Sequence, residues 1–235
     1  YETCDYFSML GSMAYHGMPT HYGHWSYGKS FEQQHSQYQH GMTGLPYELI
    51  INSDPCISYL MLENPLYLQI LIMAHCVGHS DFFKINRNFG FTRADTVVPR
   101  MRNAKKRIQA YCEDPHIGVE KVEELIDACH AVSYQVPRYP MDIPDLPEEY
   151  ERYRINNLDT VKKNKVDARD LPYKPEYDLL GFCSAYGEHK EDWERDVMEI
   201  VRDEAYYFMP QIRTKTMNEG WACFWHYKIL HELEL

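Results

Sequence analysis

Apolar residues recur at helical spacing through the middle of the chain. After Asn64-Pro65 they occupy every face of residues 66–83, which predicts a long buried helix whose first turn accommodates Pro65. Residues 99–112 and 119–132 each place apolar side chains on one face, as amphipathic helices do. These three segments predict a helical core.

Helical patterns resume at Leu179. Residues 192–209 direct apolar side chains to one face and predict a helix that ends at Pro210, because proline interrupts helical hydrogen bonding. Residues 216–233 predict the last helix.

The first part of the chain is less regular. Residues 15–28 hold three glycines and a proline and predict an irregular loop. Residues 29–40 predict a polar helix. Residues 47–52 fit either a strand or a turn of helix, and residues 55–62 predict a helix.

A proline-rich segment divides these patterns. Residues 137–178 contain six of the 13 prolines among many charges, and we interpret them as a linker or an extended arm. We therefore expect a helical part at residues 1–136, the arm at 137–178, and helices at 179–235 that pack on the first part as one domain. The predicted fold is mainly α, an irregular multi-helix domain.

The composition mainly excludes classes of protein. The 235 residues are 44% hydrophobic and 25% charged, which is typical of a globular protein. A net charge of −11 disfavours nucleic acid as a partner. The sequence contains no stretch of about 18 apolar residues, so it predicts no transmembrane helix. The seven cysteines are scattered and never form a CxxC pair, which favours reduced thiols and a cytoplasmic location.

The predicted buried helix contains a histidine pair. His75 and His79 are four positions apart, so they lie one above the other on a helix and both imidazoles can bind one metal ion. Zinc metallohydrolases with this spacing carry a glutamate general base directly after the first histidine, where this chain has Cys76. The alternative is a pair of core histidines hydrogen-bonded to neighbours.

The last predicted helix offers a carboxylate. Glu219, Cys223 and His226 share one face at i, i+4 and i+7. The small residues Gly220 and Ala222 permit another helix to approach closely, so Glu219 is a candidate third metal ligand. Alternatively, Glu219 forms a cap or a salt bridge on a helix that packs through its aromatic residues.

Two further segments carry polar residues with candidate roles. Glu204 precedes Ala205 on the inward face of the 192–209 helix and is a candidate general base or extra metal ligand. Pairing with Arg202 or a lysine is an equal alternative for Glu204. In the glycine-rich loop His24 is a candidate pocket residue, whereas His21 is expected at the surface.

Several long segments resemble the stage V sporulation protein R (SpoVR) family. They are residues 15–29 (YHGMPTHYGHWSYGK), 47–56 (YELIINSDPC), 74–86 (AHCVGHSDFFKIN), 193–211 (WERDVMEIVRDEAYYFMPQ) and 214–226 (TKTMNEGWACFWH).

The resemblance implies a mainly helical, cytoplasmic protein. Family members are about twice this length, which implies that the chain is the N-terminal portion, and the family is linked genetically to spore cortex formation. The resemblance also brings the HxxxH and NEGWA motifs into one chain, as gluzincin-like metallopeptidases pair a histidine helix with a later glutamate helix. This second comparison is an analogy at the level of the fold.

These observations lead to a hypothesis of a zinc-dependent amide hydrolase that acts on a peptide, for example one related to peptidoglycan. His75, His79 and Glu219 would bind the metal, Glu204 or His226 would transfer the proton, and Tyr207 would donate a hydrogen bond to the oxyanion. Two alternatives stay open. One is a non-enzymatic regulator or scaffold of sporulation or stress response, and the other is a non-haem iron enzyme, because two histidines and a carboxylate also suit iron.

Overall fold

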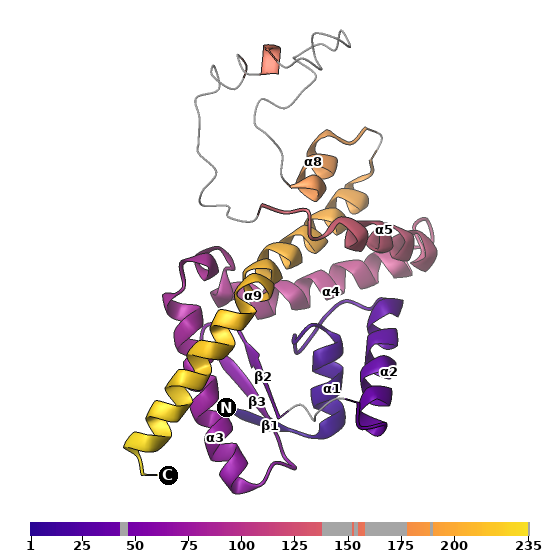
Figure 1. Cartoon of the computed structure of the whole chain (residues 1–235). Coiled ribbons are helices and arrows are strands. Elements are labelled where there is room, and N and C mark those ends of the chain that lie inside the picture. Colours follow the sequence, from indigo (N-terminus) through magenta and orange to yellow (C-terminus); the bar gives the residue numbers. More distant parts are fainter. Residues whose placement is uncertain (43–46, 138–151, 153–154, 158–177, 189, 235) are drawn as a thin grey trace.

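The structure is a computed structural model that describes residues 1–42, 47–137, 152, 155–157, 178–188 and 190–234 (Figure 1). The described elements are β1 (Glu2–Cys4), α1 (Tyr6–Ala14), α2 (Trp25–Gln39), β2 (Glu48–Ile51), β3 (Ile57–Met61), α3 (Leu66–Ile85), the 3₁₀ turns η1 (Arg87–Phe91) and η2 (Ala94–Thr96), α4 (Val97–Glu113), α5 (Val119–Val132), α8 (Leu179–Tyr186) and α9 (Asp192–Glu232). The fold is mainly α, as predicted. The predicted arm at 137–178 lies almost wholly outside the described residues.

Three of the predicted helices are confirmed with close boundaries. The helix predicted at 66–83 is α3, the one at 99–112 is α4, and the one at 119–132 is α5. Their apolar patterns are long enough to distinguish a helix from a strand. The helix predicted at 29–40 is also present as α2, although it begins earlier, at Trp25.

The helix predicted at 55–62 is wrong. This segment contains β3, the central strand of a three-stranded sheet with the order β1-β3-β2. β3 pairs parallel to β1 and antiparallel to β2. Its side chains alternate between half-buried and buried positions, with Ser58 and Leu60 turned inward. A run of five residues is too short for its period to be read with certainty, and pairing on both edges decides its conformation.

The predicted break at Pro210 is also wrong, because α9 continues through this proline for 41 residues. Pro210 lacks the N–H that would bond the carbonyl four residues earlier, at a usual cost of about 3 kcal/mol. Tyr207 and Met209 before the proline and Ala222 after it are all buried. Packing on both sides therefore holds the helix together across Pro210.

α9 is the axis of the molecule. α3 lies against its C-terminal half, while α4, α5 and α8 contact its N-terminal half (Figure 1). The largest buried cluster joins α4, α5 and α9 around Ile108, Ile126 and Val197, which are at most 1% exposed. The long helix thus connects the core that it forms with α4 and α5 to its contact with α3.

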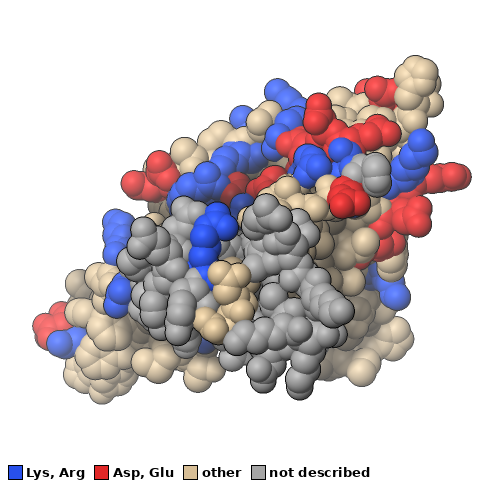
Figure 2. Space-filling model, turned by 90° about the horizontal axis from the view of Figure 1, so that it is seen from above, with Lys and Arg blue, Asp and Glu red and all other residues tan. Residues whose placement is uncertain are grey.

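Charges of both signs lie among the described residues of one face of the molecule (Figure 2). Seen from above, Lys and Arg side chains are interspersed with Asp and Glu (Figure 2). Between α4 and α9, Arg100 pairs with Asp203 at 2.7 Å and Arg107 pairs with Asp196. Among the described helices, none combines the length and apolar character needed to cross a lipid bilayer.

Candidate metal centre

α3 and α9 approach each other most closely where both lack bulky side chains. A Cβ atom on Gly78 would lie 2.6 Å from the Cα of Ala222, a distance that no real contact allows. The predicted role of Ala222 in a close helix approach is therefore correct. Gly220 does not take part, since a Cβ there would meet nothing within 4 Å.

The close approach brings His75 and His79 of α3 beside Glu219 of α9. The ring centroids of the two histidines lie 4.6 Å apart. Their Nε2 atoms lie 3.6 Å and 3.8 Å from Oε2 of Glu219. His79 is buried and His75 is half-buried, whereas the Glu219 side chain is 51% exposed. The cluster therefore reaches solvent on the α9 side.

A second carboxylate, which the sequence reasoning missed, completes the cluster. Glu48 of β2 places Oε1 3.6 Å from Nε2 of His75 and 3.9 Å from Nε2 of His79. The pattern of residues 47–52 fits either a strand or a helical turn, and a single glutamate there carries no spacing signal. Only the packing of β2 against α3 reveals its role.

Cys76 supports Glu48 rather than the metal ligands. Its Sγ donates a hydrogen bond to Oε2 of Glu48 at 3.4 Å. Burial, together with the nearby Glu48, raises the pKa of the Cys76 thiol, so the thiol stays protonated and is a poor nucleophile. Burial also raises the pKa of Glu48 to about 7, against the lowering effect of the Cys76 hydrogen bond and with a further rise from Glu219.

Neighbours on α9 orient both imidazole rings. His79 Nδ1 donates to Oδ1 of Asn218 at 2.8 Å, which leaves the lone pair on Nε2. His75 Nδ1 and His226 Nδ1 share a hydrogen bond of 3.0 Å, and donation by His75 frees its Nε2 in the same way. Burial, followed by the proximity of His79 and His226, lowers the pKa of His75 and favours the neutral ring that a metal requires.

The donor set fits a divalent transition metal. Ligand atoms around a tetrahedral zinc ion with bonds of about 2.1 Å lie about 3.4 Å apart. The nitrogen–oxygen distances of 3.6–3.9 Å exceed this value by a few tenths of an ångström. His75 also belongs to a second group with Cys223 and His226, whose ligand atoms lie within 4.8 Å of one another. Its Nε2 faces the carboxylates and its Nδ1 faces His226, so the two groups use different nitrogens.

Two of the predicted catalytic residues lie elsewhere. Along α9, Glu204 lies about 22 Å from Glu219, given a rise of about 1.5 Å per residue. It is buried and contacts His21 and Tyr22 instead of the metal cluster. Tyr207 is buried and donates its hydroxyl to the Asn52 carbonyl at 3.0 Å. The third, His226, borders the cluster through His75.

The expected surface position of His21 is wrong. His21 is 1% exposed, and its Nε2 lies 2.9 Å from Oε1 of Glu204. Its loop lies over α9, and the buried carboxylate attracts the ring to the interior. His24, which belongs to the same loop, caps α2, where its Nδ1 accepts from the Ser26 backbone N–H.

Comparison with known proteins identifies a matching family and a relative of this chain. The sequence model of the family described as SpoVR like protein matches residues 1–235. The uncharacterized protein YcgB of Escherichia coli (strain K12) is 42% identical over 244 positions, which cover 96% of this chain and 48% of YcgB. The chain thus spans about half the length of this curated relative. No solved structure matches the chain, so the gluzincin-like helix pairing stays a prediction.

Proposed function

The chain belongs to the SpoVR-like protein family, and we propose that it is a zinc-dependent hydrolase of amide bonds whose metal is bound by His75, His79 and Glu219. One observation carries the proposal. The Nε2 atoms of two histidines on α3 face carboxylate oxygens from β2 and α9 across 3.6–3.9 Å.

Glu48 is the general base in this proposal. A bound zinc ion polarises a carbonyl and lowers the pKa of water. Glu48 takes a proton from the attacking water and delivers it to the amine nitrogen as the C–N bond breaks, which yields a carboxylic acid and an amine. Its position beside Cys76 supports this role, since Cys76 stands where zinc metallohydrolases with the same histidine spacing carry their base. Glu48 thus replaces Glu204 in the mechanism.

An open groove beside the cluster supports a peptide substrate. It has a volume of about 530 Å³ and begins at His226, with walls formed by Leu71, Tyr227 and Leu230. Apolar walls with a few polar groups suit an extended peptide that carries apolar side chains. The family's genetic link to the spore cortex favours a peptide related to peptidoglycan. The seven free cysteines support a cytoplasmic site of action.

A non-haem iron enzyme is the second candidate. The cluster contains two carboxylates, Glu48 and Glu219, beside its two histidines, and oxygen-rich donor sets of this kind suit iron. On the third hypothesis, a regulator or scaffold, the same residues form a polar network that fixes the helices without metal. The identity and the amount of metal in the purified protein separate these three hypotheses.

The test is a cleavage assay with zinc-loaded protein. Internally quenched peptides and peptidoglycan stem peptides serve as probes. We expect Glu48→Gln to retain zinc and to lose at least about 100-fold in kcat, because loss of a general base typically costs this much.

Glu63→Gln is the matched control, because Glu63 is exposed near the same sheet and the charge change is identical. It should cleave at the parent rate. Zinc-loaded protein that cleaves none of the probes, or a Glu48→Gln variant with the parent kcat, would overturn the proposal.

A further inference from the structure

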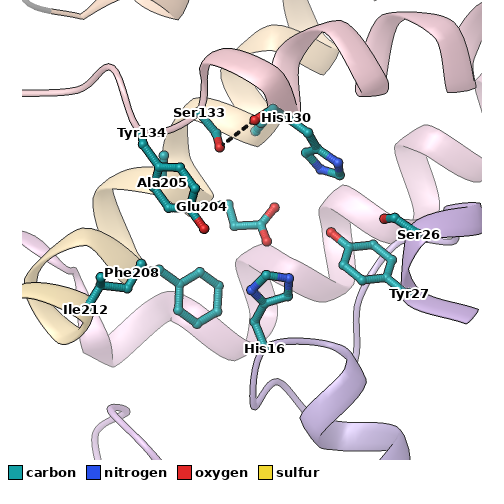
Figure 3. A pocket seen from close by; sticks show the side chains of 11 residues that line it. His16, Ser26, Tyr27, His130, Ser133, Tyr134, Glu204, Ala205, Phe208 and Ile212 are labelled. Carbon is teal, nitrogen blue, oxygen red and sulfur yellow. Dashed lines mark hydrogen bonds between the residues drawn. The ribbon is translucent and has the colours of Figure 1, made fainter. Parts of the chain in front are cut away.

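A second polar site lies about 22 Å away along α9, separate from the metal centre. It is a cavity of about 180 Å³ between α2, α5 and α9 (Figure 3). A water molecule needs about 10–15 Å³ of such space, so the cavity has room for a small organic molecule. His16, Tyr27 and His130 surround the carboxylate of Glu204, which lies at its centre (Figure 3).

Glu204 is the charged residue of this cavity. His21 Nε2 contacts Oε1 at 2.9 Å, and the Tyr22 hydroxyl donates to Oε2 at 2.8 Å. Neither His21 nor Tyr22 lines the cavity, so both hold the carboxylate from behind. Burial alone would raise the pKa of Glu204, but His21 and these hydrogen bonds outweigh it and lower the pKa. The group is therefore an anion inside the protein.

The carboxylate retains acceptor capacity toward the cavity. A carboxylate offers about four acceptor positions, and the described contacts of His21 and Tyr22 use two of them. Tyr22 also binds His130 Nε2 at 3.0 Å, so His130 donates to the tyrosine oxygen and its Nδ1 is left with a lone pair.

The other histidines at the cavity add no positive charge. Burial lowers the pKa of both His16 and His130, so these rings are neutral near pH 7. A ligand there meets one carboxylate and uncharged acceptors. An anion would be repelled by Glu204. A metal ion is disfavoured because, among the described residues, both groups with metal-ligand spacing include His75 and neither includes a residue of this cavity.

The walls of the cavity suit an organic cation, the class of charged ligand that remains after anions and metal ions. Tyr27, Tyr134 and Phe208 contribute aromatic rings, and Val201 and Ile212 contribute apolar surface. Aromatic faces attract organic cations because the face of the ring carries partial negative charge. We propose that this cavity binds a small organic cation, a primary ammonium or a guanidinium, whose N–H groups bond Glu204 and whose carbon atoms pack on Phe208 and Tyr27.

The test is calorimetric titration with ethylammonium and methylguanidinium, with ethanol and acetate as size-matched neutral and anionic probes. We expect saturable binding of the two cations only. Glu204→Gln should weaken it at least about 10-fold, the loss expected when a charged hydrogen bond is removed. Glu232→Gln, an identical change at an exposed site on α9, should leave binding unchanged.

A measurement on the unaltered protein keeps the test decisive if Glu204→Gln does not fold. In NMR spectra, saturation with ethylammonium should shift the ring signals of His16 and His130 and leave those of the exposed His40 and His116 in place. Removal of metal with a chelator should change neither result. The proposal would be overturned by an absence of saturable binding, by equal binding of acetate, or by shifts confined to His40 and His116.

Discussion

At the scale of single residues, the two buried carboxylates differ in what balances their charge. Glu48 has a thiol and two imidazoles beside it, and burial dominates, so its pKa rises to about 7. Glu204 is more deeply buried, yet His21 and Tyr22 compensate for the burial and its pKa falls. A metal ion would supply the positive charge that Glu48 lacks, whereas His21 and Tyr22 hold Glu204 as an anion that keeps acceptor positions free toward the cavity.

The histidines near Glu204 predict acid lability. Burial lowers the pKa of His16 and His130 below the usual 6.5, so the unfolded chain binds more protons than the folded chain just below pH 6.5. The resulting stability is present above pH 6.5 and is lost as the pH falls. Glu204 acts in the same direction below about pH 4.5, because its pKa is also lowered.

Scanning calorimetry between pH 7.5 and pH 5.5 checks this expectation. The Tm should fall with pH, and the fall should be smaller in His130→Gln, whose side chain can still bond Tyr22 but does not titrate. A Tm that is constant or rises on acidification would refute the assignment, as would an unchanged slope in the variant.

Spacing on a helix makes some of these residues predictable. His75 and His79 are i and i+4, and Glu219 stands beside small residues, so the sequence indicates that they can meet. Glu48 and His21 have no such signal, since a strand residue and a loop residue are oriented only by the elements that pack on them. The polar residues most difficult to predict are therefore those outside the helices.

At the scale of elements, the contact between α3 and α9 determines the geometry of the metal centre. Each helix supplies ligands, so their separation fixes the distance between His75 or His79 and Glu219. The contact between Gly78 and Ala222 keeps that separation small. A single methyl group at Gly78 is thus a direct perturbation of the centre.

Gly78→Ala should destabilise the protein by about 1–3 kcal/mol, the usual result of overpacking a contact that includes backbone. It should also weaken zinc binding, because the ligands of the two helices move apart. Denaturant unfolding and zinc titration measure the two effects.

Gly220→Ala is the matched control. It lies on α9 with nothing within 4 Å of its added Cβ, and a helix gains up to about 1 kcal/mol from this change. Equal stability and equal zinc affinity in the two variants would show that the close contact does not hold the centre together.

The element predictions failed where tertiary contacts override local pattern. β3 is a short segment whose strand pairing on both edges outweighs a helical pattern, and α9 passes Pro210 because buried side chains hold both halves. The long amphipathic segments, α3, α4 and α5, were predictable because their burial pattern repeats over several turns.

At the scale of the whole molecule, one helix carries both polar sites. α9 supplies Glu204 to the cavity in its N-terminal half and Glu219 to the metal centre in its C-terminal half. Pro210 lies between them. The two sites share a helix but no side chain among the described contacts, so we expect each to be altered by mutation without loss of the other.

X-ray absorption at the zinc edge of the reconstituted protein tests the metal centre most directly. We predict one zinc ion per chain with two imidazole nitrogens and carboxylate oxygen at about 2.0–2.2 Å, and no sulfur at about 2.3 Å. His79→Ala should lose the metal, and Cys223→Ser should leave the spectrum unchanged. Less than about 0.1 equivalent of bound zinc, or a zinc–sulfur distance that disappears in Cys223→Ser, would contradict a site built from His75, His79 and Glu219.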